Sequence, residues 1–244
     1  MTSMADSVPS GGAASTEALQ NGFPGRTLAG IAMVAAPPLA FIGSTLGISS
    51  YDERGARFVQ GMVAHPVLFD LGAQFALSGV IVLMVAVIGL AQLVAPARPR
   101  LGRTGALLSL IGLCGPVSFE STYWAASHLT DTEAHRGAAA LMIDTSQIIP
   151  STVMNVSGPA LVVGFVLLAV AAAKAGVLGR TRAIALGATC LIPVGFISGY
   201  LAISAAVFVL TGVALVPLGV RLLRGAHGSK APSAVLPGAR PATR

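Results

Sequence analysis

Long apolar runs separated by short polar connections occupy most of this chain. A helix needs roughly 20 mostly apolar residues to cross the hydrocarbon core of a bilayer. The run from Arg182 to Leu223 is about twice that length, so we expect a tight turn at Ser198-Gly199-Tyr200, with one long bent helix as the alternative. The pattern predicts an all-α polytopic transmembrane helix bundle with six spans, at 27–48, 68–94, 103–126, 150–173, 182–199 and 201–223.

Small and polar residues replace this pattern at both ends of the chain. Residues 1–25 are rich in Ser, Gly and Ala, and they lack the basic start and apolar middle of a signal peptide. Residues 225–244 are rich in Pro, Gly, Arg and Ser. Both compositions are typical of disordered segments. We therefore expect two disordered tails, the second of them basic, around one transmembrane domain at 26–224.

Composition supports a membrane environment. Hydrophobic residues make up 54% of the 244 residues and charged residues only 10%, whereas about a quarter of a soluble domain is charged. The net charge of +6 does not indicate nucleic acid binding, because the basic residues are scattered between apolar runs without an aromatic-rich patch. Abundant Ala, Gly, Val and Arg, with little Lys, indicate a GC-rich bacterial genome. The lipid bilayer is thus the first expected partner.

Basic residues are distributed unevenly between the two predicted sides of the bundle. Arg54, Arg57 and Arg136 lie on one side, and the other 12 Lys and Arg residues lie on the side that carries both termini. Cytoplasmic connections of membrane proteins carry the excess of Lys and Arg. We therefore expect a multi-pass protein of the bacterial inner membrane with both termini in the cytoplasm.

An internal repeat is visible in the sequence. Residues 101–119 (LGRTGALLSLIGLCGPVSF) and 178–196 (LGRTRAIALGATCLIPVGF) match at eight of 19 positions without gaps. The preceding spans share a Ser-Gly pair, at Ser78-Gly79 and Ser157-Gly158. Spans two and three therefore resemble spans four and five as a parallel repeated hairpin. Some transporters place their sites between such repeats, but duplication is also a simple way to build a bundle.

Glycine and proline within the spans bear on packing. Gly43/Gly47 and Gly195/Gly199 form GxxxG pairs, which allow helix backbones to approach closely. Pro37-Pro38 is the strongest predicted break, because proline lacks a backbone donor and frees a carbonyl. Carbonyls freed there would line a cavity, bind an ion or belong to a packed kink. Further prolines lie in the later spans, at Pro116, Pro159, Pro193 and Pro217.

Polar residues concentrate toward the predicted outer side. Asp70 and Gln74 are four residues apart, and so are Glu120, Trp124 and His128, which places each set on one helix face. A third stripe, with Asp144 and Asn155, leads into span four. The simplest arrangement turns the stripes toward one another around an outward-facing polar pocket. The candidate ligand-binding residues are Asp70, Gln74, Glu120, Tyr123, His128, Asp144 and Asn155.

Glu120 is the most specific of these candidate functional residues. It lies about two helical turns below the outer end of its span. A charge at such a depth is costly unless it is paired, solvated or protonated, and an intramembrane acid is by default a functional-site hypothesis. The alternative is a neutral or hydrogen-bonded Glu120 that serves packing alone. Its counterpart in the repeat is Ile197, so the hairpin itself does not require an acid there.

Other chemistries receive less support. His65 and His128, with nearby carboxylates, would suit a metal ion or haem, but no compact ligand motif occurs, so we predict no cofactor. Trp124, Tyr51, Tyr123 and Tyr200 match an aromatic belt at the membrane surface. Residues 133–148 form an amphipathic stretch, either a surface helix or a continuation of span four. No Walker A loop, dinucleotide fingerprint or zinc-ribbon spacing is present.

The span pattern, the Leu-Gly-Arg-Thr hairpin starts and His65-Pro66 before span two resemble small multi-pass membrane proteins of high-GC bacteria. The function of that group is unknown, so the resemblance implies no catalytic or ligand residues. Three hypotheses follow from the residues. The first is a small transporter-like or solute-binding protein for a small solute or cation. The second is a non-catalytic accessory or sensor subunit that binds another membrane protein, and the third is a metal- or haem-binding redox protein.

Overall fold

The computed structural model describes residues 25–46, 56–129, 132–192 and 201–228, and in these ranges the regular structure is entirely helical. The all-α fold class is confirmed. The helices are α2 (Arg26–Leu46), α4 (Ala56–Ala64), α5 (Pro66–Val94), α6 (Pro99–Ser127), α7 (Glu133–Lys174), α8 (Arg180–Gly187), the 3₁₀ helix η1 (Ala188–Leu191) and α10 (Leu201–Gly228).

Five of the described helices are long and apolar enough to cross a membrane. The qualifying segments are Arg26–Leu46, Pro66–Val94, Pro99–Ser127, Asn155–Lys174 and Ala205–Gly225. They overlap the predicted spans one, two, three, four and six. Helices rather than strands form because these runs contain few polar residues, and a helix satisfies its own backbone hydrogen bonds in an apolar environment.

The predicted fifth span, 182–199, is not confirmed. Its described part consists of α8, which has eight residues, and the four-residue η1. These two elements together measure about 20 Å, which is shorter than the hydrocarbon core of a bilayer. The predicted turn at Ser198-Gly199-Tyr200 lies outside the described residues. The structure therefore gives five candidate spans where the sequence pattern predicts six.

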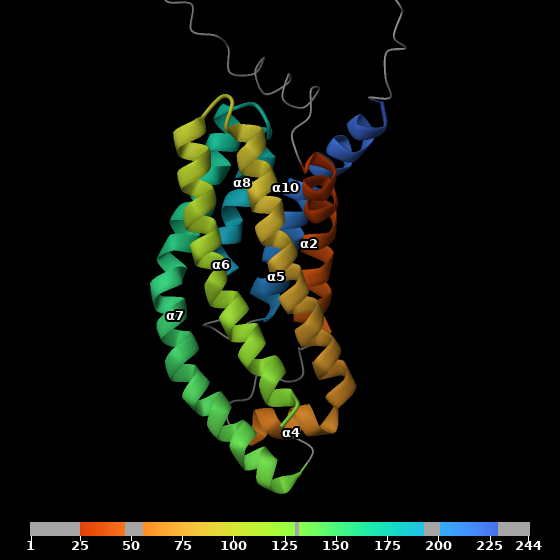
Figure 1. The fold of residues 1–244 in the computed structure, drawn as a ribbon, viewed down its shortest axis with the longest axis vertical. Helices are drawn as coiled ribbons and strands as arrows, with labels where there is room; N and C mark the ends of the chain where they lie inside the picture. Colours follow the sequence, from red (N-terminus) through yellow and green to blue (C-terminus); the bar gives the residue numbers. More distant parts are fainter. Residues whose placement is uncertain (1–24, 47–55, 130–131, 193–200, 229–244) are drawn as a thin grey trace, which may run out of the picture.

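Two helical features were left open or missed by the sequence pattern. The amphipathic stretch 133–148 is a continuation of span four, because α7 runs without interruption over 42 residues. Thr132 begins this helix, and its hydroxyl accepts a hydrogen bond from the backbone N–H of His135 at 3.2 Å. The short helix α4 was not predicted, and it lies crosswise at the lower end of the bundle in Figure 1, near the ends of α5, α6 and α7.

Glycines bring α2 and α5 into close antiparallel contact. A methyl group added to Gly43 would overlap the backbone of Ala76, and one added to Gly79 would overlap that of Ala40. Small residues at a helix interface permit this approach, which increases dispersion contacts between helices in lipid. Gly43 is one member of a predicted GxxxG pair. Its partner Gly47 and the pair Gly195/Gly199 lie outside the described residues.

Close packing at glycine residues also joins α6 to α7. A methyl group on Gly112 would overlap Leu161, and one on Gly164 would overlap Ser109. These contacts fix an antiparallel register in which α6 begins beside the end of α7. In α2, Pro37 is buried, and its side chain lies next to Gly212 of α10 (3.4 Å from a carbon added to that glycine). Pro37 is therefore packed within the bundle, and α2 continues through both prolines as one helix.

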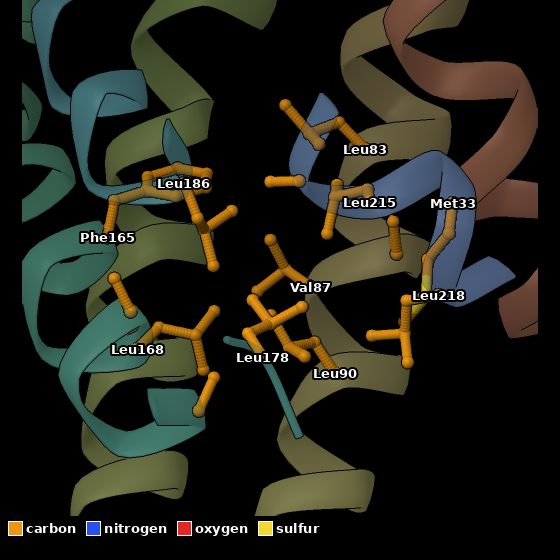
Figure 2. Packing of buried hydrophobic residues seen from close by; sticks show 14 of the residues in the cluster. Met33, Leu83, Val87, Leu90, Phe165, Leu168, Leu178, Leu186, Leu215 and Leu218 are labelled. Atoms are coloured by element: carbon orange, nitrogen blue, oxygen red, sulfur yellow. The ribbon is translucent and has the colours of Figure 1, made fainter. Parts of the chain in front are cut away.

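The main hydrophobic core lies between α2, α5, α6, α7, α8 and α10. Figure 2 shows Leu83, Val87 and Leu90 of α5 facing Phe165 and Leu168 of α7, with side chains from α2, α8 and α10 completing the layer. Phe165, Leu168 and Leu90 have at most 1% of their surface exposed. A second, smaller core of Val59, Met62, Phe69, Ala126 and Ala139 joins α4 to the adjacent ends of α5, α6 and α7.

A buried hydroxyl pair attaches η1 to α10. Thr211 donates its proton to the backbone carbonyl of Val207 at 2.8 Å. Because a hydroxyl has one proton, Thr189 must be the donor in its 2.9 Å contact with Thr211. Both side chains have 0% exposure, so the pair satisfies two polar groups that would otherwise be costly inside the bundle.

The two ends of the bundle differ in charge. A carbon added to Gly225 would collide with the guanidinium of Arg26, so α2 begins beside the last turns of α10. The antiparallel register brings the junction of α5 and α6 and that of α7 and α8 to this same end (Figure 1). We call it the basic end, and its described basic residues are Arg26, Arg98, Arg100, Arg103, Lys174, Arg180, Arg182, Arg221 and Arg224. The opposite end, with α4, is called the α4 end.

The two copies of the sequence repeat have different structures. Residues 101–119 lie within the single continuous helix α6, whereas 180–191 are divided between α8 and η1. The shared Ser-Gly pairs differ as well, because Gly79 packs tightly on Ala40 while Gly158 has open space beside it. The repeated hairpin is therefore not confirmed, and the duplication remains a feature of the sequence.

Candidate functional site

Asp70 is the centre of a polar network at the α4 end. Its carboxylate accepts a hydrogen bond from the Nε2 amide of Gln74 at 2.8 Å and one from the indole N–H of Trp124 at 3.1 Å. The first bond follows from the spacing of four residues on α5. The second crosses between helices, and it orients the carboxylate toward α6.

His128 completes the network from the last turn of α6. Its Nε2 atom lies 3.8 Å from Oδ1 of Asp70, the same oxygen that accepts from Trp124. The imidazole also meets the Trp124 ring edge-on, with centroids 5.0 Å apart and planes at 88°. The side chains of Asp70 and His128 are 33% and 58% exposed, so both remain accessible. The spacing Trp124–His128 on one helix face is what permits both contacts.

A cavity of about 250 Å³ adjoins this network. Asp70 and His128 line it together with Ser127, whose hydroxyl donates to the backbone carbonyl of Trp124 at 2.6 Å. The remainder of the described wall is apolar and comes from α4 and the first turn of α5. Its members are Met62, Pro66, Val67 and Phe69.

Local sequence places the wall of this cavity. Pro66 is the first residue of α5, where a missing N–H costs nothing, and the preceding His65 is non-helical with φ −135° and ψ 57°. The break lets α4 turn across the bundle end, where Val59 and Met62 are buried. The α4–α5 junction therefore supplies the apolar part of the wall. Asp70 of α5, with Ser127 and His128 at the end of α6, supplies the polar part.

Glu120 lies two helical turns before His128 on α6. It is 2% exposed, and it takes part in an interaction within the protein. Glu120 is not among the described residues of the cavity wall. A buried carboxyl with an internal partner is consistent with the packing alternative as well as with a functional role, so its assignment to the pocket stays a prediction.

The other predicted residues are placed only in part. The side chains of Tyr123 and Asp144 lie outside what the structure describes. Asn155 lies on α7 with an exposed side chain, and Gln74 is exposed while bonded to Asp70. The structure thus brings Asp70, Gln74 and His128 together. It gives no contact between Asn155 and this group.

The predicted donors for a metal are two histidines and nearby carboxylates. His65 is exposed at the start of α5, and it is not part of the described cavity wall. Among the described residues, no group of three or more His, Cys, Asp or Glu side chains is placed to hold a metal ion. Asp70 and His128 form a pair.

Sequence reasoning missed the role of Trp124 and the α4 wall. Trp124 was interpreted as part of an aromatic belt, yet its N–H donates to Asp70. The signal was available, because a partly buried indole N–H usually has a partner, and Trp124 shares a face with His128. Met62 could not be assigned, because α4 is too short to show a clear helical period.

Comparison of the chain with protein-family models, with curated proteins and with solved structures finds no match.

Proposed function

We propose that this chain is a multi-pass protein of the bacterial inner membrane and a small transporter-like or solute-binding protein. In this proposal both termini are cytoplasmic, and the α4 end faces the outside. Five helices of sufficient length and apolarity support the membrane assignment. The concentration of Arg and Lys at the basic end supports the orientation, because cytoplasmic connections carry such residues.

The observation that carries the proposal is the cavity beside the Asp70 network. Small-molecule sites are concave and largely apolar, with a few oriented polar groups that determine specificity. The cavity has this character, with apolar lining from α4 and α5 and three polar side chains, those of Asp70, Ser127 and His128. If this junction served packing alone, it would not need a partly exposed Asp70 carboxylate that accepts hydrogen bonds from side chains of α5 and α6.

Narrowing the cavity tests this function directly. Val67 lines the cavity and is 68% exposed, so Val67→Phe adds bulk to the wall without disturbing a buried position. Leu68 is 48% exposed and is not among the described lining residues, which makes Leu68→Phe the matched control. The probes are butylammonium, butyramide and butyrate, which have similar length and differ in charge. Binding to purified protein in detergent is measured by titration calorimetry.

We expect at least one probe to bind the unmodified protein with one site per chain. Val67→Phe should weaken that binding about tenfold or more, since overpacking a site costs on the order of 1–3 kcal/mol. Leu68→Phe should leave it unchanged. If no probe binds, or if both variants bind as the unmodified protein does, the cavity is not a solute site and the proposal fails.

A further inference from the structure

We infer that the cavity takes a small aliphatic ammonium, with Asp70 as its counter-ion. This inference rests on the proposed function and specifies the chemical class of the solute. It is drawn from three observations: the charge of the cavity wall, its apolar remainder, and the fixed orientation of the Asp70 carboxylate.

The charge of the wall favours a cation. Asp70 supplies the acidic group of the described lining, His128 lies 3.8 Å from it as the histidine of that lining, and no Lys or Arg is among the described residues there. Its two hydrogen-bond donors, Gln74 and Trp124, are neutral groups. They orient the carboxylate without cancelling its charge. A carboxylate accepts about four hydrogen bonds, so lone pairs remain on both oxygens for an N–H of the solute.

The apolar remainder of the wall selects among cations. Ca²⁺ and Mg²⁺ require about six or more oxygen ligands, whereas the described wall offers the Asp70 carboxylate and the Ser127 hydroxyl. An alkyl chain, in contrast, gains by leaving water for the surface of Met62, Val67 and Phe69. An organic ammonium can pair its charge with Asp70 and place its alkyl chain against the apolar residues of the wall.

Trp124 acts as a positioning residue for the proposed counter-ion. Its indole N–H holds Oδ1 of Asp70 at 3.1 Å, and its ring rests edge-on against His128. This arrangement fixes the carboxylate before the solute arrives, which lowers the entropy cost of binding. Trp124 is also the single tryptophan of the chain, so its emission reports on the carboxylate it contacts.

The same three probes test the inference. Butylammonium should bind, and butyramide and butyrate should bind at least about tenfold more weakly, because only the first pairs with a carboxylate. Titration of the unmodified protein with butylammonium should shift Trp124 emission, and sodium at equal ionic strength should not. Asp70→Asn keeps a hydrogen-bond acceptor of the same shape and removes the charge, so it should weaken butylammonium binding about tenfold or more.

Glu133→Gln is the matched control, because Glu133 is an exposed acid in the first turn of α7 outside the described cavity wall. It should bind butylammonium like the unmodified protein. If butyramide or butyrate bound more tightly than butylammonium and Val67→Phe weakened that binding, the ammonium inference would be overturned. The cavity would still be a solute site. If Glu133→Gln weakened butylammonium binding as much as Asp70→Asn does, the effect would come from overall charge. The ammonium inference would then also be overturned. Binding of none of the probes would overturn both proposals. Probe selectivity of the unmodified protein decides the question even if Asp70→Asn does not fold.

Discussion

At the scale of single residues, Asp70 organises the candidate site. Two of its contacts follow from the sequence: Gln74 lies one helical turn away, and His128 belongs to a polar stripe expected to face it. The contact with Trp124 was missed, because the aromatic belt gave a sufficient explanation for an indole at a membrane surface. Spacing on a helix predicts which side chains share a face, but it does not predict the partner across the interface.

At the scale of helices, apolar run length predicted most of the bundle to within a few residues. The clear cases are α2, α5 and α6, whose apolar stretches are long and whose ends carry proline, glycine or charge. The fifth predicted span is not confirmed, because its described part consists of the short helix α8 followed by the 3₁₀ helix η1 from Ala188. Hydropathy alone does not distinguish a spanning helix from a shorter apolar segment that packs inside the bundle.

Close packing of α6 on α7 predicts a sharp difference between two glycines. Gly112→Ala should destabilise the protein by about 1–3 kcal/mol, because its methyl group would overlap the backbone of Leu161 and force the helices apart. Gly158→Ala, in α7, meets open space. It should be neutral or stabilising by up to about 1 kcal/mol, because alanine favours the helix.

Thermal unfolding of both variants in the same detergent measures this difference. Equal unfolding temperatures for Gly112→Ala and Gly158→Ala would show that the α6–α7 contact is not as close as the structure describes. Loss of stability in Gly158→Ala alone would also contradict the packing account.

At the scale of the whole molecule, charge asymmetry connects the fold to the proposed function. The antiparallel packing places the basic residues of α2, α6, α7, α8 and α10 at one end of the bundle. Asp70, Trp124 and His128 meet at the other end. The sequence predicted that acids and histidines gather on one side, because alternating spans place alternate connections together. It could not predict the cavity, since the place of Met62 in its wall depends on α4 crossing the bundle end before His65-Pro66.

The central claim is that the cavity opens on the outer side of a membrane-spanning bundle. The most direct test is thiol labelling in intact bacterial cells, in a variant with Cys114 and Cys190 replaced by Ala. Ser127→Cys places a thiol in the cavity wall, and Thr181→Cys places one on the exposed surface of α8 at the basic end. A membrane-impermeant maleimide should label the first in intact cells and the second only after the membrane is permeabilised. Labelling of Thr181→Cys but not of Ser127→Cys in intact cells would contradict the account.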